Sequence, residues 1–337
     1  RRKAAAAPGY HDRYGDQAAD QRSDRHGNGG GDQADKCGSG GSSGGGAGGS
    51  GGTVSTGGSG GSGGAGGSGG STSCSEGPGF PSSAPQQPVA ELTATILDLG
   101  GAPAANVGVQ LCGLDLCING STTDQGVVCS DKGTGFCTPG LTSTDSFKLP
   151  AFKYGDGIGF VKFAQLLPAG TTKHNVGTVM TAKLPDVAQG VALTPGGSAT
   201  SSGVVLTLAA GAKITIDELT FDTPELQKFR AAEVPIAKAP PAVDKSAGFE
   251  IIVGTTPINT ELCPHGGLSV PNTAGWAADT EVEFWLHGVE ASEDKLWAPY
   301  GGWAKVSGGK VSSDGKSVVT HDGEGVPVLG VFGIKKK

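Results

Sequence analysis

Cysteine offers more chemistry than any other residue type in this sequence. There are seven cysteines, an odd number, and four of them lie between Cys112 and Cys137. Such clustering favours an oxidising compartment, in which thiols join as disulfides. The seven are Cys37, Cys74, Cys112, Cys117, Cys129, Cys137 and Cys263.

Two pairs of cysteines flank short segments that can turn back on themselves. Cys112 and Cys117 enclose "GLDL", and Cys129 and Cys137 enclose "SDKGTGF". A tight hairpin would place the members of each pair within bridging distance. We therefore predict a Cys112–Cys117 disulfide and a Cys129–Cys137 disulfide.

Other arrangements of these thiols stay open. Cys74 and Cys263 would form a third pair, and the sequence alone does not choose among the pairings. The alternative for the cluster is one zinc ion held by four thiolates, although their spacings differ from the usual C-x-x-C pairs of zinc sites.

The common catalytic motifs are missing from the folded part of the sequence. Outside the Gly/Ser-rich run at residues 38–73, the sequence contains no G-x-S-x-G, H-E-x-x-H, phosphate-binding loop, C-x-x-C or dinucleotide fingerprint. We interpret "CPHGG", residues 263–267, as a turn. We expect no catalytic residue, no cofactor and no metal, so the protein is predicted not to be an enzyme. A metal-dependent hydrolase built on His265, His287 and Glu283 is the least favoured alternative.

Aromatic residues gather near the C-terminus. Flat rings at the edge of a sheet can stack on sugar faces, so these residues are candidates for ligand binding. A role in the core competes with this, because strand alternation would place Phe284 and Trp285 on opposite faces. The candidates are Trp276, Trp285, Trp297, Tyr300 and Trp303.

The elements that must position these residues read as strands. Apolar residues alternate in "VAELTATILDL" from residue 89, and again at Val282, Phe284 and Leu286. Turn signals recur every 8 to 12 residues or so, a pattern typical of β-sandwiches. We predict an all-β fold with two β-sandwich-type domains.

The N-terminal region has a different composition. Residues 38–73 are almost entirely glycine and serine without a charged residue, which predicts a flexible tether. Residues 1–36 lack periodicity, and we expect them to be disordered and to come from a fragment or a mistranslated start. The predicted divisions are 1–36, a tether at 37–87, and domains at 88–181 and 182–337.

Charge and hydropathy exclude several classes of protein. The net charge of −7 would repel a nucleic-acid backbone, so no nucleic-acid partner is expected. The closing "KKK", residues 335–337, is interpreted as a solvated tail. No apolar run reaches the roughly 18 residues of a membrane-spanning helix.

A cysteine followed directly by Gly/Ser repeats resembles the mature start of a bacterial lipoprotein, particularly the myxobacterial type. The resemblance implies that Cys37 carries lipid and that the protein lies on the bacterial outer membrane or cell surface, or is otherwise secreted. A free or disulfide-bonded Cys37 is the alternative.

Two further resemblances concern the predicted domains. "TILDLGGAPAANVGVQL" at residues 95–111, with "TTDQGVV" at 122–128, is similar to carboxypeptidase-regulatory-like repeats, which form small transthyretin-like sandwiches without catalytic activity. Residues 190–214 resemble the opening of ZU5-like domains. Residues 280–334 resemble a bacterial surface-protein module.

Together these features predict a non-catalytic cell-surface lipoprotein with a binding, adhesion or envelope-structural role. The alternative is a carbohydrate-binding accessory module that uses the tryptophans. The expected partners are a membrane, reached through the lipid anchor, and a cell-surface polysaccharide or protein.

Overall fold

The computed structural model describes residues 77–80, 87, 89–113, 117–128, 151–290 and 296–337. Within these ranges strands dominate, and the helical segments are three 3-10 turns of three residues each. The predicted all-β fold is confirmed. Cys37, Cys74 and all of the predicted tether except residues 77–80 and 87 lie outside the described residues.

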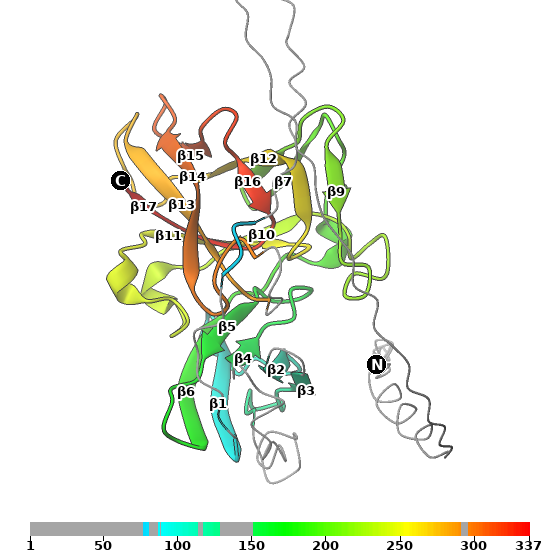
Figure 1. Ribbon diagram of the computed structural model, residues 1–337, viewed down its shortest axis with the longest axis vertical. Coiled ribbons are helices and arrows are strands. Elements are labelled where there is room, and N and C mark those ends of the chain that lie inside the picture. The colour runs from blue at the N-terminus through cyan, green and yellow to red at the C-terminus, as the bar shows by residue number, and fades with distance from the viewer. Residues whose placement is uncertain (1–76, 81–86, 88, 114–116, 129–150, 291–295) are drawn as a thin grey trace, which may run out of the picture. The chain divides into compact units, whose positions relative to one another are not determined.

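The N-terminal strands form two small sheets (Figure 1). β1 pairs in parallel with β6, and the other four form an antiparallel sheet in the order β3-β2-β4-β5. Alternation in β1 buries Leu92, Ala94 and Ile96, as the sequence pattern predicts. The strands are β1 (Glu91–Asp98), β2 (Gly108–Cys112), β3 (Cys117–Ser121), β4 (Ala151–Tyr154), β5 (Phe163–Leu166) and β6 (Lys173–Thr181).

The remaining strands form a large antiparallel sheet. Its main path runs β10-β11-β17-β13-β14-β15-β12-β8-β7, and β9 and β16 also pair with β12. The strands are β7 (Ser198–Ser201), β8 (Val204–Thr207), β9 (Lys213–Thr215), β10 (Arg230–Glu233), β11 (Ile251–Thr256), β12 (Glu261–Pro271), β13 (Glu281–His287), β14 (Trp303–Val311), β15 (Ser317–Thr320), β16 (Val326–Val328) and β17 (Val331–Lys336). The 3-10 turns are η3 (Val187–Gln189), η4 (Ile236–Lys238) and η5 (Lys245–Ala247).

The two ends of this path come together. The backbone N–H of Ala231 in β10 donates a hydrogen bond to the hydroxyl of Ser201 in β7, at 3.0 Å. The sheet therefore curls around an inner core, which includes Val282, Phe284 and Leu286 of β13. Side chains at the alternate positions of β13 point the other way.

β11 separates two hydrophobic cores. Ile251 and Val253 belong to the inner core of the large sheet, whereas Ile252 packs in a second core with Tyr154 and Phe163 of the small sheet. All six residues of β11 are buried, which is the pattern of a strand covered on both faces. The second core therefore draws residues from both predicted domains, and the division after residue 181 stays a prediction.

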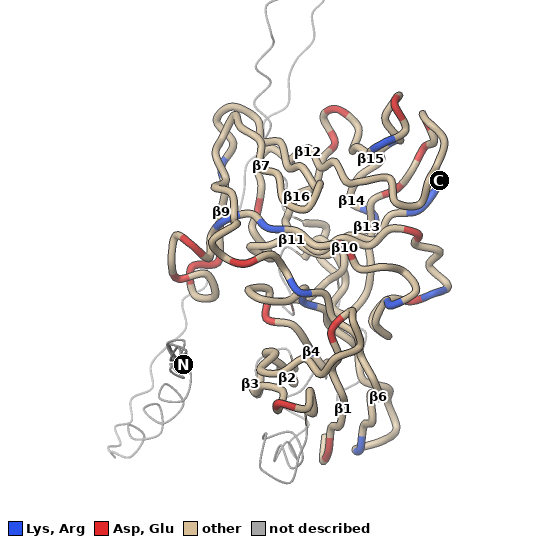
Figure 2. The backbone as a smooth tube through the Cα atoms, turned by 180° about the vertical axis from the view of Figure 1, so that it is seen from behind, with Lys and Arg blue, Asp and Glu red and all other residues tan. Residues whose placement is uncertain are grey.

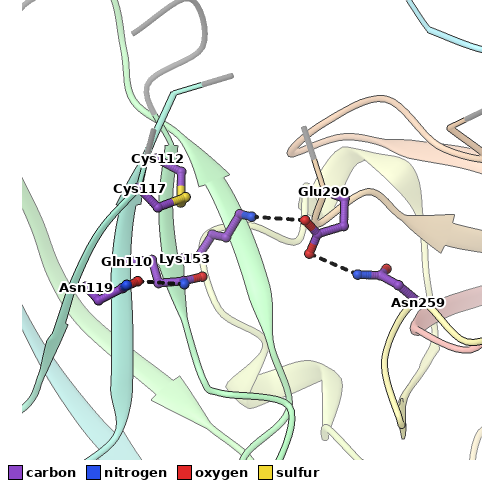
Figure 3. The surroundings of a disulfide bond; sticks show 7 residues. All are labelled: Gln110, Cys112, Cys117, Asn119, Lys153, Asn259 and Glu290. Carbon is purple, nitrogen blue, oxygen red and sulfur yellow. Dashed lines mark hydrogen bonds and ion pairs between the residues drawn. A yellow bond between two sulfur atoms is a disulfide. The ribbon is translucent and has the colours of Figure 1, made fainter. Parts of the chain in front are cut away.

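The hairpin of β2 and β3 carries a disulfide. Cys112 and Cys117 are joined, with their Cα atoms 4.1 Å apart (Figure 3), which confirms the local pairing. The four-thiolate zinc site is wrong, because two of its thiols are used in this bond. Cys129 and Cys137 lie outside the described residues. Cys263 is also disulfide-bonded.

Figure 2 shows basic and acidic residues interspersed along the loops and strand ends. In the part of the chain that the structure describes, no helix is long and apolar enough to cross a membrane.

Candidate ligand-binding pocket

A pocket of about 590 Å³ lies where β5, β13, β14 and β17 meet the loop around η5. Its volume falls within the range of roughly 300 to 1,000 Å³ that is usual for small-molecule sites. Three aromatic and three polar side chains line it, together with small and aliphatic residues. The six are Phe249, Trp285, Trp303, Gln165, Asp244 and Lys335.

The aromatic wall comes from separate parts of the chain. Phe249 follows η5, Trp285 lies on β13 and Trp303 opens β14. The ring centroids of Phe249 and Trp303 are 4.7 Å apart, and those of Phe249 and Trp285 are 6.3 Å apart, with the rings tilted in both pairs. Both indoles are only half-buried, so part of each ring stays open to the pocket.

Strand alternation explains how Trp285 reaches the pocket. Phe284 is fully buried in the inner core, and Trp285 faces the other side of β13, as predicted from the sequence. The indole N–H donates to Glu283 Oε2 at 3.1 Å, and Lys305 Nζ contacts the other carboxylate oxygen at 3.1 Å. Burial raises the pKa of Glu283, but the hydrogen bonds from Lys305 and Trp285 outweigh burial, so the pKa is lowered overall. Glu283 therefore holds the indole as an ionised acceptor.

Lys335 packs its ammonium group on this wall. Lys335 Nζ lies 4.5 Å from the ring centroid of Trp285 and 5.8 Å from that of Phe249, and it donates to the carbonyl of Ala247 at 3.1 Å. A cation over an aromatic face is attracted by the ring quadrupole. The interpretation of "KKK" as a solvated tail is thus wrong for Lys335, which belongs to β17 and is half-buried.

Two polar groups complete the lining. Asp244 caps η5 by accepting hydrogen bonds from the hydroxyl and the backbone N–H of Ser246, and these bonds lower the pKa of its carboxyl group. Gln165 on β5 has a buried Oε1 that accepts no hydrogen bond from any described residue. The pocket thus offers the carboxylate of Asp244.

His287 packs against Trp303 of the aromatic wall and fixes the neighbouring backbone. Its Nε2 accepts a hydrogen bond from the backbone N–H of Ala164 at 3.0 Å, and its Nδ1 donates to the carbonyl of Gly302 at 3.0 Å. Its ring lies 4.7 Å from that of Trp303. Burial lowers the pKa of His287 to about 4, so the ring is neutral at physiological pH. It ties β5 to the start of β14 and has no nitrogen left for a ligand.

The structure separates the other predicted aromatic residues from this pocket. Trp276 is buried in the inner core and donates to Glu250, and Tyr300 is buried beneath the ammonium of Lys153. Trp297 packs edge-on against His265 at 5.3 Å. Of the five candidates, Trp285 and Trp303 alone line the pocket.

The residues of the hydrolase alternative do not form a metal site. Among the described residues no group of three His, Cys, Asp or Glu side chains could hold a metal ion. His265 contacts the carbonyl of Glu324 through Nδ1, and His287 and Glu283 have the partners given above. The interpretation of "CPHGG" as a turn is wrong. The segment lies within β12, where that strand changes pairing partners.

A second polar cluster lies beside the disulfide (Figure 3). Lys153 Nζ is 3.6 Å from Glu290 Oε2, and Asn259 donates to the other oxygen of this carboxylate at 2.9 Å, so that Glu290 stands between them. Burial lowers the pKa of Lys153 to about 8, although the charge of Glu290 opposes this. No motif marks these three residues in the sequence, so sequence reasoning missed the cluster.

Comparisons with known proteins give no family. No protein-family model matches the sequence, and no curated protein matches it. A similar solved structure is that of the Bacillus anthracis TIE protein, with 12% sequence identity and a TM-score of 0.20. The similarity covers 74% of this chain and 46% of that chain, so this chain spans less than half of its length. At this TM-score the likeness carries no argument about fold or function.

Proposed function

We propose that this protein is a non-catalytic binding protein of the bacterial cell surface, held there by lipid on Cys37, and that it binds a saccharide in the aromatic pocket. The observation that carries the proposal is the pocket itself. It combines two half-buried indoles with a carboxylate, an ammonium and an amide.

This combination suits a sugar. The apolar C–H face of a sugar ring can stack on an indole, while its hydroxyl groups both donate and accept hydrogen bonds. Asp244 in the lining is an acceptor for those hydroxyls. Binding of this kind requires no catalytic group.

Glycan-array screening followed by calorimetry on the full chain tests the ligand. Trp285→Ala and Trp303→Ala should each weaken saccharide binding by roughly tenfold or more, because each removes a stacking surface. Trp297→Ala is the matched control, since Trp297 is also half-buried but lies outside the pocket lining. Equal losses in all three variants would contradict a site at this pocket.

Palmitate labelling of the intact gene product tests the anchor. The native protein should incorporate lipid and partition with membranes, and Cys37→Ser should do neither. A native product that takes up no lipid would remove the anchor from the proposal and leave the saccharide site in place.

A further inference from the structure

The ammonium of Lys335 already occupies the aromatic wall of the pocket. It lies over Trp285 and Phe249 and donates to the carbonyl of Ala247. No ion pair joins it to a carboxylate of the described residues. Its neighbour Lys336 differs, because that side chain is 54% exposed and lies 3.9 Å from Glu250. The wall is therefore a binding place for an ammonium group, filled by a side chain of the chain itself.

The carboxylate of Asp244 would attract the cationic group of a ligand to the pocket. Glu283 is already paired with Lys305. Asp244 lines the same pocket, is ionised because hydrogen bonds from Ser246 lower its pKa, and forms no ion pair with a described residue. Its negative charge would attract a positively charged ligand, and any such ligand would enter beside the aromatic faces.

We propose that the pocket takes the primary ammonium group of an amino sugar, and that this group replaces the ammonium of Lys335 on Trp285 and Phe249. The inference rests on the proposed saccharide site and names its ligand class. A primary ammonium reproduces both contacts of Lys335, the aromatic faces and the carbonyl of Ala247. Displacement is feasible because Lys335 forms no direct ion pair with a carboxylate of the described residues, although Glu283 attracts its charge, and because it lies near the end of β17, so that its side chain can turn to solvent.

A pair of oligosaccharides of equal length separates charge from shape. A glucosamine oligomer in mildly acidic buffer carries ammonium groups, whereas the N-acetylglucosamine oligomer has the same backbone without them. By calorimetry on the full chain we expect the glucosamine oligomer to bind roughly threefold more tightly, because Asp244 attracts its ammonium groups while the cation–π contact is only exchanged with Lys335. Equal affinity for the two oligomers would overturn the inference and leave the saccharide site standing. Failure of both to bind, together with a negative glycan array, would remove the proposed function as well.

Lys335→Met tests the replacement directly. If Lys335 competes with the ligand, its removal should tighten glucosamine-oligomer binding by about fivefold, because the aromatic faces become free. Lys336→Met is the control on the same strand and should leave the affinity unchanged. Weaker binding by Lys335→Met would show that Lys335 recognises the ligand, and would overturn the proposal.

Asp244→Asn tests the counter-charge. Asparagine keeps an acceptor for Ser246 but loses the charge, so glucosamine-oligomer binding should fall by roughly threefold or more. Asp314→Asn is the matched control, since Asp314 makes similar turn hydrogen bonds and does not line the pocket. Equal effects of the two variants would contradict a local role for Asp244.

Discussion

The two faces of β13 differ completely within one short strand. On the inner face Val282, Phe284 and Leu286 are buried among apolar neighbours. On the outer face Glu283 and Trp285 are half-buried and make polar contacts that orient the pocket wall. Because neighbouring residues on a strand point to opposite faces, one element can stabilise the fold and shape a site through separate residues. The inner face should govern unfolding, and the outer face should govern binding.

The largest expected effect comes from the inner face. Phe284→Ala should lower the free energy of unfolding by about 3 to 5 kcal/mol, because it empties a fully buried ring position. Urea denaturation checks this, with Trp285→Ala as the partner variant on the outer face. If Trp285→Ala costs as much stability as Phe284→Ala, the division between the two faces fails.

His287 lies on the outer face of β13, yet it should affect the free energy of unfolding as the pH is lowered. Its pKa is lowered by burial to about 4 in the folded protein, from an ordinary value of 6.5. Between these values the unfolded chain binds more protons, so stability is complete above pH 6.5 and is lost as the pH falls towards 4. The loss should total roughly 3 kcal/mol. Urea midpoints measured across this range check it, and His287→Gln should remove that part of the slope.

Glu290, just beyond the end of β13, should have a smaller effect. Glu290→Gln removes the charge that opposes the desolvation of Lys153, so the pKa of Lys153 should fall below about 8. Stability should drop by about 1 to 2 kcal/mol, less than for a fully buried pair because the Glu290 side chain is 43% exposed. NMR titration of the lysine side-chain signals measures the pKa. An unchanged or higher value would mean that Glu290 does not set it.

The smallest change in stability is expected at Glu283. Glu283→Gln weakens the contact with Lys305, whose side chain is 44% exposed, and should cost under about 1 kcal/mol. Saccharide affinity should fall by a larger proportion, about threefold, because the Trp285 indole loses its ionised acceptor. Calorimetry and urea denaturation of the same sample compare the two. A loss of stability without any loss of affinity would contradict the view that the outer face of β13 governs binding.

Local patterns predicted much of the fold. Alternation at residues 282–287 predicted the strand and the opposite directions of Phe284 and Trp285. The short spacing between Cys112 and Cys117 predicted their disulfide. Both results follow from sterics within a few residues, which a sequence displays directly.

The composition of the pocket could not be predicted in this way. Gln165, the segment from Asp244 to Phe249, and Lys335 come from three distant parts of the chain, and no periodicity relates them to Trp285. The "KKK" pattern indicates a polar tail, yet pairing of β17 with β13 places Lys335 against an indole. The "CPHGG" segment is rich in turn-forming residues, yet pairing with β8, β9 and β16 holds it extended. Tertiary pairing overrides local preference at both places.

β11 belongs to both hydrophobic cores, and this has a consequence for how the chain would melt. A chain shortened to begin at residue 182 would leave Ile252 and Val331 facing water on the side where Tyr154 and Phe163 now cover them. Heating should therefore give a single transition across all three sheets, and a sugar held in the pocket would protect residues on each side of the shared strand from amide exchange.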